Sequence, residues 1–397
     1  MNNPPGIHSD HRVALLHNRY RRRGGEERFV DQLVELFSQR GLRHVVLERD
    51  STKQNSKLGN LRAGGGLVAG GSGTRQVGKA VSQLGATVLH AHNIYPTFGV
   101  RSLAAARAAG AAVILHVHNY RLFCATGTAF RDGRDCEACA PRRTWNGVRY
   151  NCRESRAEAG AYGVGLGLHQ AKLQSTVDLF VAPTQSLADD LTRLGAADSV
   201  SVLPSALPSN DFVESSRAGD GTYGLFAARA APEKGLDVAI AAASASGVPL
   251  RVAGDGPMMQ SARSQATQLS APVEFLGVLN RAQLSSQRAG AAFAIFPSLW
   301  REVLPLASLE AMAGGLPLIA SDAGGLSDLA EPNLRVPRGD VKALATTMRA
   351  LFDDPAARQA AGERALARVR AEHDEDLFFE RLNALYDRAV EKRAAAK

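Results

Sequence analysis

The stretch FPSLWREVLPLASLEAMAGGLPLIASDAGG, residues 296–325, decides how this chain folds. An apolar run over residues 291–297 ends at a proline and predicts a buried strand. Pro305 then opens a helical pattern, at a position where its missing N–H has no helical partner to lose. Gly314 ends that pattern, and the apolar residues 316–320 predict the next strand. The stretch therefore predicts a strand–loop–helix–strand unit of an α/β fold.

Two glutamates, Glu302 in the loop and Glu310 on the helix, stand eight residues apart in this unit. Carboxylates are strong acceptors for sugar or ribose hydroxyls, and ligands of open α/β sheets bind outside the carboxyl ends of the strands. Two glutamates alone are more often solvated surface charges. Here E-x7-E is followed by A-M-A-G-G-L-P, and the segment resembles the signature of the retaining glycosyltransferases of family four, which have the GT-B fold.

The resemblance covers nearly the whole chain and implies an α/β protein with two Rossmann-like domains facing each other across a cleft. Alternation of apolar strand patterns and helical patterns agrees with this class. We expect an acceptor-side domain over residues 1–208, which contains a cysteine-rich insertion at 124–152, and a nucleotide-sugar donor domain over 209–372. The last helix, 373–397, carries an apolar stripe and is expected to pack back on the first domain.

Composition and charge fit a globular protein with anionic ligands. The chain has 397 residues, 45% hydrophobic and 22% charged, and no apolar run approaches the length of about 20 residues that a membrane span needs. The N-terminus lacks the apolar core of a secretory signal, so a cytoplasmic location is expected. The net charge of +8 and the basic turn at 19–23 favour nucleotide diphosphates and permit peripheral contact with the inner membrane face.

Two cations mark a candidate anion site in the second half. Arg229 and Lys234 stand five residues apart in RAAPEKG, at the entrance of a predicted helix whose N-terminus attracts negative charge. A solvated pair of loop cations is the alternative, but the spacing resembles the donor-diphosphate motif of the family. In the first half, Gly24 and Gly25 form a turn after the first strand. It is either an ordinary tight turn or, by resemblance, a loop near the donor diphosphate.

The resemblance also assigns roles around the donor. Arg229 and Lys234 would stabilise the leaving diphosphate, Glu310 would hold the ribose, and Glu302 would hold the transferred sugar. The further donor-binding residues that it implies are Val303 and Leu304 through their backbone N–H groups, and Gly254, Gly256 and Gly277 in turns near the nucleotide.

Two predicted strands of the first half end in histidine and asparagine. His118 and Asn119 follow the strand that begins near residue 112, and by resemblance His118 is the residue that contacts the transferred sugar. His116 points to the same face of a strand and is the competing assignment. His92 and Asn93 end the preceding strand and are candidates for acceptor contacts, although a structural loop histidine is equally compatible with the sequence.

Every cysteine of the chain lies in one short segment with the spacing C-x11-C-x2-C-x12-C, comprising Cys124, Cys136, Cys139 and Cys152. A C-x2-C pair with two further thiolates suits a tetrahedral structural zinc site. The polar, turn-rich sequence between the cysteines would gain stability from such an ion. An iron–sulfur cluster, disulfides or unligated thiols remain alternatives, and disulfides are disfavoured in a reducing compartment.

The sequence predicts a retaining glycosyltransferase that moves a sugar from a nucleotide-diphosphate donor, UDP by family habit, to an acceptor hydroxyl. The acceptor would be a glycan, a lipid-linked glycan or a natural product. No catalytic metal is expected, because two cations can stabilise the leaving group and no D-x-D pair stands in a donor loop.

Two alternatives to transfer remain. A GT-B nucleotide-sugar epimerase or hydrolase would consume donor without an acceptor. A basic zinc protein that binds nucleic acid is disfavoured, because the cysteine segment, with Trp145 and Tyr150 nearby, lacks the interleaved aromatic and basic residues of base-stacking modules.

Overall fold

The structure is a computed structural model that describes residues 10–19, 24–50 and 64–396. The chain forms two units. Unit 1 contains residues 1–129, 136–205 and 378–397, and unit 2 contains residues 130–135 and 206–377. The chain thus passes from unit 1 to unit 2 between Ser205 and Ala206, whereas the sequence predicts the domain boundary after residue 208. Of the basic turn expected at 19–23, residues 20–23 lie outside the described part of the chain.

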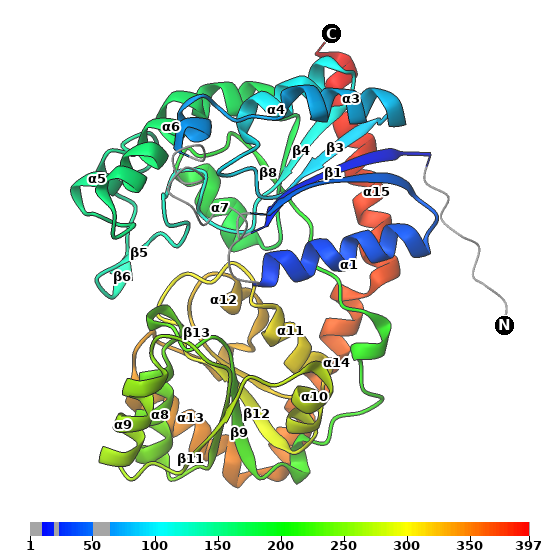
Figure 1. Cartoon of the computed structure of the whole chain (residues 1–397). Coiled ribbons are helices and arrows are strands. Elements are labelled where there is room, and N and C mark those ends of the chain that lie inside the picture. The colour runs from blue at the N-terminus through cyan, green and yellow to red at the C-terminus, as the bar shows by residue number, and fades with distance from the viewer. Residues whose placement is uncertain (1–9, 20–23, 51–63, 397) are drawn as a thin grey trace, which may run out of the picture. The chain divides into compact units, whose positions relative to one another are not determined.

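Within its described residues, unit 1 contains a six-stranded parallel sheet in the order β2-β1-β3-β4-β7-β8. Figure 1 shows α3, α4 and α6 along one side of this sheet and α1 on the other. The elements are β1 (Arg12–Arg19), α1 (Gly25–Gln39), β2 (Arg43–Asp50), α3 (Thr74–Leu84), β3 (Val88–Ala91), α4 (Gly99–Ala108), β4 (Ala112–His116), α5 (Asn146–Arg149), α6 (Arg156–Thr176), β7 (Leu179–Ala182), α7 (Gln185–Arg193), β8 (Val200–Val202) and α15 (Glu375–Ala395).

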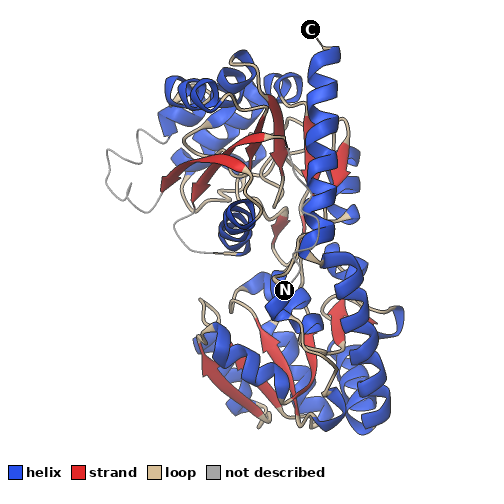
Figure 2. Cartoon of the chain, turned by 90° about the vertical axis from the view of Figure 1, so that its right-hand side faces the viewer, coloured by secondary structure: helices blue, strands red, loops and turns tan. Residues whose placement is uncertain are grey.

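The central strands of unit 1 are apolar on both faces. Residues 13–16 of β1 have no exposed surface, as expected for a parallel strand that helices cover on both sides. The last helix, α15, runs beside these strands and ends at the C mark in Figure 2. From Phe378 onward it belongs to unit 1, and it buries an apolar stripe made of Phe378, Phe379, Leu382, Leu385, Tyr386 and Ala389.

Unit 2 contains, within its described residues, a second six-stranded parallel sheet in the order β11-β10-β9-β12-β13-β14. Its elements are a short hairpin of β5 (Phe130–Arg131) and β6 (Arg134–Asp135), then β9 (Tyr223–Ala227), α8 (Leu236–Ser246), β10 (Leu250–Ala253), α9 (Met259–Gln268), β11 (Val273–Gly277), α10 (Arg281–Ala289), β12 (Ala291–Phe296), α11 (Leu306–Ala313), β13 (Leu318–Ser321), α12 (Gly325–Leu329), β14 (Arg335–Val336), α13 (Val341–Asp353) and α14 (Pro355–His373).

Strand β12 shows why this sheet needs helices on both faces. Phe293 and Ile295 enter one apolar core, and Ala294 and Phe296 enter the core on the opposite face. Every residue of the strand is buried, so the two-residue alternation of a strand serves two cores at once.

The predicted strand–loop–helix–strand unit is present as β12, α11 and β13. The sequence predicts Pro305 as the first residue of the helix, but it is the N-cap of α11, one position earlier. Gly314 is the C-cap. Glu302 lies in the connecting loop and forms an isolated parallel bridge with Gly324.

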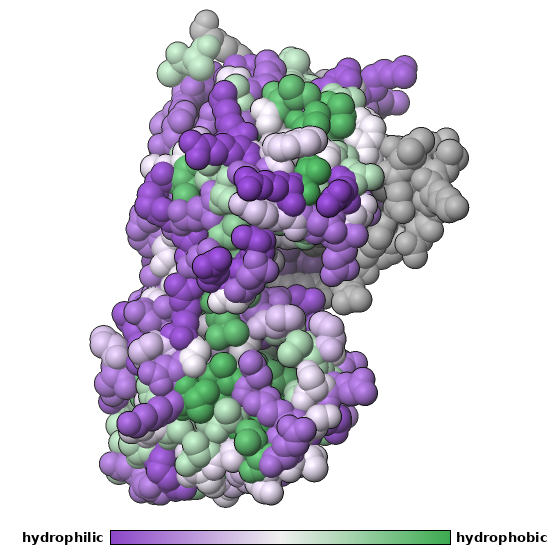
Figure 3. All heavy atoms as spheres, turned by 90° about the vertical axis from the view of Figure 1, so that its left-hand side faces the viewer, coloured by the Kyte–Doolittle hydropathy of each residue, from purple (hydrophilic) through white to green (hydrophobic). Residues whose placement is uncertain are grey.

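No helix in the described part of the chain is both long and apolar enough to cross a bilayer. On the face drawn in Figure 3, hydrophilic side chains interrupt the apolar areas.

Candidate active site

The strand order of unit 2 reverses between β9 and β12, and the loops that follow these two strands hold Lys234 and Glu302. In open parallel sheets, ligands bind outside the carboxyl ends of the strands at such a switch point. The topology therefore brings together two predicted site residues from separate parts of the sequence.

The loop after β9 has a backbone that only glycine allows at one position. Residues Pro232–Lys234 form a 3-10 turn, and Gly235 follows with φ +67° as the N-cap of α8. A Cβ atom on Gly235 would lie 1.9 Å from the carbonyl oxygen of Pro297, which ends the neighbouring strand. Gly235 therefore lets the Lys234 loop approach the loop after β12 closely.

Lys234 and Glu302 form a partly buried ion pair. The Lys234 Nζ atom lies 2.6 Å from Glu302 Oε1, and Ser298 Oγ donates a hydrogen bond of 2.6 Å to the same oxygen. The ammonium also lies 5.2 Å from the centroid of the Trp300 ring. Glu302 is 3% exposed, so its charge depends on these partners. Sequence reasoning placed both charges at the donor but did not foresee that they pair, and it missed Ser298 and Trp300.

Arg229 is arranged differently from Lys234. Its Nη2 atom lies 2.6 Å from Glu233 Oε1, and its side chain is 52% exposed. The guanidinium can therefore turn toward a ligand at the cost of a surface ion pair, which is worth about 0–1 kcal/mol.

Glu310 forms a buried ion pair with Arg288, which lies on α10. Both side chains are buried, so each charge stabilises the other in a place where water is scarce. No local pattern indicated a role for Arg288, because its partner lies 22 residues away on the next helix.

The predicted donor glycines pack against the loop after β9. Cβ atoms on Gly254 and Gly256 would lie 2.1 Å and 2.3 Å from the carbonyl oxygens of Ala228 and Ala230. Gly254 N also donates to the carbonyl of Gly277 at 2.7 Å, which joins the ends of β10 and β11. These turns therefore support the backbone on which Arg229 stands.

Four other predicted donor residues lie as follows. Val303 is buried and Leu304 is half-buried, directly after Glu302. In unit 1, Gly24 is the N-cap of α1, and its N–H donates to Glu27 Oε2 at 2.8 Å, while Gly25 is the first residue of the helix.

A pocket in unit 1 lies at the carboxyl ends of β3 and β4. Residues that line it include Glu26, His92, His116, His118 and Asn119. His118 is half-buried and His116 is 1% exposed, so of the two competing histidines His118 has the more accessible ring. His92 Nδ1 and His118 Nε2 share a hydrogen bond of 2.9 Å.

Burial keeps three of the histidines of unit 1 neutral. The pKa of His118 is lowered to about 3, mainly by desolvation and also by repulsion from His17 and His90 in their charged forms. Desolvation also lowers the pKa of His90 to about 3 and that of His17 to about 4. At neutral pH, each ring therefore offers one N–H donor and one lone pair to a neighbouring hydroxyl or ion.

The two predicted asparagines support turns. Asn93 is buried, with Nδ2 donating to the carbonyl of Asn18 at 2.7 Å and Oδ1 accepting from the N–H of Tyr95 at 3.0 Å. Asn119 Oδ1 accepts from the N–H of Arg121 at 2.9 Å, and its Nδ2 donates to Glu26 Oε2 at 3.3 Å. Asn119 borders the pocket, whereas the amide of Asn93 is committed to the backbone around it.

The four cysteines are thiols rather than disulfides. Burial raises the pKa of Cys139 to about 12, and the charges of Cys124 and Cys152 act in the same direction. Among the described residues, the cysteines form no group of three or more side chains whose ligand atoms all lie within 4.8 Å of one another. Three histidines do form such a group.

Comparison with solved structures defines the class. The chain is similar to the structure of HepE from Anabaena in complex with UDP and glucose, with a TM-score of 0.65 and 16% identity over 95% of this chain and 99% of that chain. At this identity the similarity shows the fold alone. The chain therefore has the two-domain GT-B fold of glycosyltransferases. Residues 209–368 match the family described as glycosyl transferases group 1.

Curated relatives are similar over part of their length. An exopolysaccharide phosphotransferase of Streptomyces coelicolor is 32% identical over 217 residues, which are 52% of this chain and 22% of the relative. A GDP-mannose-dependent monoacylated alpha-(1-6)-phosphatidylinositol monomannoside mannosyltransferase of Corynebacterium glutamicum is 34% identical over 167 residues, 39% of this chain and 44% of the relative. The chain thus spans less than half the length of either protein.

Proposed function

We propose that this protein is a retaining glycosyltransferase that moves a sugar from a nucleotide-diphosphate donor to an acceptor hydroxyl. The observation that carries the proposal is the Lys234–Glu302 pair at the switch point of unit 2. A cation and a carboxylate in contact can hold a sugar diphosphate from both ends, the ammonium on a phosphate oxygen and the carboxylate on sugar hydroxyls.

The reaction breaks the bond between the anomeric carbon and the diphosphate oxygen and forms one to the acceptor oxygen, which loses its proton. Negative charge develops on the departing diphosphate. Lys234 lies where it can stabilise that charge, and Arg229 can join it by leaving Glu233. With two cations at the leaving group, the proposal needs no catalytic metal ion.

The sugar and nucleotide would be held by neighbouring groups. In the proposal, Glu302 and the backbone N–H groups of Val303 and Leu304 bind the transferred sugar, and Glu310 binds the ribose with its carboxylate oriented by Arg288. His118 would contact the transferred sugar as a neutral imidazole.

The donor base is proposed to be uridine. A solved structural neighbour holds UDP and glucose, whereas a curated relative depends on GDP-mannose, so guanosine is the alternative to test. UDP should raise the melting temperature of the full-length protein more than GDP at equal concentration. The reverse order would replace uridine with guanosine and leave the proposed reaction class intact.

The reaction class has its own test. Purified protein is incubated with a nucleotide sugar alone and with a panel of glycan, lipid-linked and natural-product acceptors. We expect donor consumption to depend on an acceptor and the product to keep the anomeric configuration of the donor, as read by NMR. Donor consumption without any acceptor, to a free or isomerised sugar, would instead show a hydrolase or an epimerase.

A membrane-bound acceptor fits one surface of unit 1. Trp145 is the N-cap of α5 and Leu168 lies in α6, and these two helices pack together. The two residues are 66% and 65% exposed. Exposed Arg142, Arg143 and Arg149 flank Trp145 in the sequence. We propose a cytoplasmic enzyme whose unit 1 contacts an anionic lipid surface here. It should float with phosphatidylglycerol vesicles and not with phosphatidylcholine vesicles, and Trp145→Ala should reduce flotation. Equal flotation with both lipids would contradict this contact.

We also propose a structural zinc ion at the four cysteines. The donor set fits, since all four thiols of the chain lie in one short segment, although they must draw together around an ion. Zinc would be held by the thiolates and would order the insertion. X-ray absorption of the purified protein should show sulfur ligands, and Cys139→Ser should release zinc. Metal-free protein with an unchanged melting temperature would contradict the proposal.

A further inference from the structure

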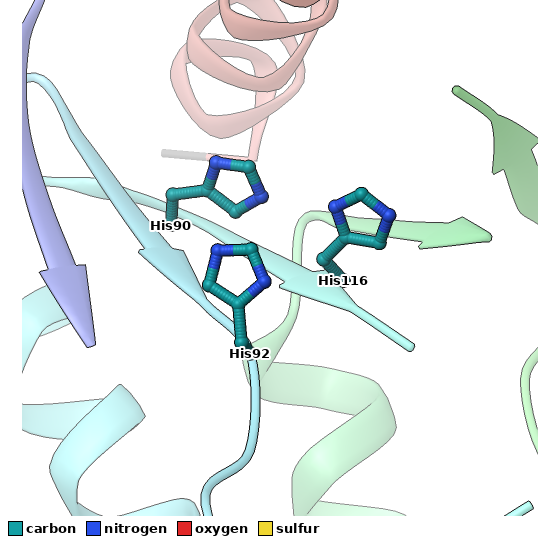
Figure 4. A group of neighbouring side chains, drawn as sticks. All are labelled: His90, His92 and His116. Atoms are coloured by element: carbon teal, nitrogen blue, oxygen red, sulfur yellow. The ribbon is translucent and has the colours of Figure 1, made fainter. Parts of the chain in front are cut away.

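Three histidines of unit 1 converge in its interior. His90 lies in β3, His92 follows that strand directly, and His116 ends β4. Because β3 and β4 are paired in parallel, with His90 opposite Ile114, the three positions fall on one face of the sheet at its carboxyl edge. Figure 4 shows the three rings gathered together. Their metal-ligating nitrogens all lie within 4.8 Å of one another.

These rings have nitrogens that no hydrogen bond within the described chain satisfies. They are His90 Nε2, His92 Nε2, and both nitrogens of His116. All three residues are buried, with 0%, 3% and 1% exposure. An unsatisfied buried polar group costs about 1–3 kcal/mol, so several in one place require an explanation.

The remaining nitrogens of two rings have partners of the kind that orient metal ligands. His90 Nδ1 is 2.9 Å from the hydroxyl of Tyr386 on α15, and His92 Nδ1 is 2.9 Å from His118 Nε2. When Nδ1–H donates to such a partner, the lone pair remains on Nε2 and is held in a fixed direction. In both rings the unsatisfied nitrogen is therefore the one that would bind an ion.

We propose that His90, His92 and His116 bind one divalent transition-metal ion, Zn²⁺ in the first instance, with a fourth position left for water or a ligand. Three imidazoles are a donor set that suits zinc and neighbouring ions such as Co²⁺. Tetrahedral Zn–N bonds of about 2.0–2.1 Å would separate the nitrogens by about 3.3 Å. The nitrogens, now within 4.8 Å of one another, would need to draw closer around the ion.

The pocket of unit 1 gives the ion a route of entry. His92 and His116 both line it, so two of the three ligands already border open space. The ion would fix His92 as the donor to His118, and this would set which nitrogen of His118 faces the pocket. The metal site is thus a separate feature from the donor pair in unit 2, and it does not rest on the proposed reaction.

The alternative to a metal site is a buried polar core of stacked neutral rings with enclosed water. The rings of His90 and His92 have centroids 4.5 Å apart, and those of His90 and His116 are parallel at 5.6 Å. Such stacking is compatible with either arrangement, and a binding measurement separates them.

The experiment titrates chelator-treated, full-length protein with Co²⁺ and then Zn²⁺. We expect one equivalent of Co²⁺ whose near-ultraviolet spectrum lacks thiolate charge-transfer bands, in addition to any ion held by the cysteines. His90→Gln/His116→Gln should lose this equivalent, whereas the matched variant His44→Gln/His169→Gln, from the same unit, should keep it. Co²⁺ bound only with thiolate bands, or an unchanged equivalent in the first variant, would overturn the proposal.

A variant that keeps all three histidines shows whether a loss of Co²⁺ binding arises from misfolding of the double variant. Tyr386→Phe removes only the hydroxyl that holds His90, and should weaken Co²⁺ binding at this site about 10- to 100-fold. Tyr223→Phe, which removes a buried hydroxyl bond in unit 2, is its control and should leave the affinity unchanged. Equal affinities in the two variants would count against ligation by His90. X-ray absorption of the zinc-loaded wild type provides an independent reading, since nitrogen ligands are expected from this site and sulfur ligands from the cysteines.

Discussion

The ammonium of Lys234 lies 2.6 Å from Glu302 Oε1, although the two residues are 68 positions apart in the chain. The pair joins the loops that follow β9 and β12, at the point where the strand order of unit 2 reverses. Each charge offsets part of the desolvation cost of burying the other, and both lie where an open α/β sheet binds its ligand.

Removing the cation of this pair should lower both activity and stability, and a second substitution should recover stability alone. Lys234→Ala should reduce kcat about 10²- to 10³-fold, because the leaving diphosphate loses a preorganised positive charge. It should also lower the urea midpoint, since Glu302 is then left buried with its main cation gone. Lys234→Ala/Glu302→Gln should recover the midpoint but not the rate. Full transfer activity in Lys234→Ala would show that the diphosphate binds elsewhere.

Arg229 should matter for catalysis and little for stability. Its ion pair with Glu233 is exposed, so Arg229→Gln should change the free energy of unfolding by less than about 1 kcal/mol. The rate should fall at least tenfold, and the loss should shrink as salt screens the interaction. Arg251→Gln is the control, because Arg251 forms a similar surface pair with Glu274 in the same unit. Equal rates in the two variants would remove Arg229 from the donor site.

The backbone at Gly235 offers a matched test of the loop that carries Lys234. Gly235 and Gly247 flank α8 with nearly equal φ angles, +67° and +66°. A Cβ on Gly235 would meet the Pro297 carbonyl at 1.9 Å, whereas one on Gly247 meets nothing within 4 Å. Gly247→Ala should cost about 1–2 kcal/mol and keep activity. Gly235→Ala should cost more and lose activity, as measured by urea unfolding and initial rates. Similar behaviour of the two would mean that the close approach is unimportant.

Glu310 and Arg288 should act as one unit in nucleotide binding. Glu310→Gln removes the proposed ribose acceptor, and Arg288→Gln releases the carboxylate that it orients. Each change should weaken binding of the nucleoside diphosphate in isothermal titration, and the double variant should lose less than the sum of the two. Additive losses would indicate that Arg288 acts independently of Glu310.

Metal-free protein should be sensitive to mild acid. Burial lowers the pKa of His90 to about 3, below the unfolded value of 6.5, so the unfolded chain binds more protons between these values. The histidine contribution to stability is therefore complete above pH 6.5 and is lost as the pH falls from there toward 3. The urea midpoint should drop between pH 7 and pH 5, and His90→Gln should reduce this drop, whereas the half-buried His169→Gln should not. An unchanged drop in His90→Gln would assign the acid sensitivity to other groups.

The sequence by itself determined the α/β class, the strand–loop–helix–strand unit around Glu302, and the positions of the charged residues in the loops after β9 and β12. These features follow from local periodicity and from proline and glycine at element ends, which act over a few residues. The E-x7-E resemblance extended them to the GT-B fold, which the structural neighbours confirm.

Only the tertiary structure decided which side chains meet. Parallel strands join residues far apart in the chain, so no local pattern shows that Lys234 pairs with Glu302, that Arg288 pairs with Glu310, or that Tyr386 reaches His90. The sequence singled out His92 and His116 as separate candidates and did not single out His90. Their assembly into one buried group depended on strand register and on α15 covering that face, and long-range packing alone sets both.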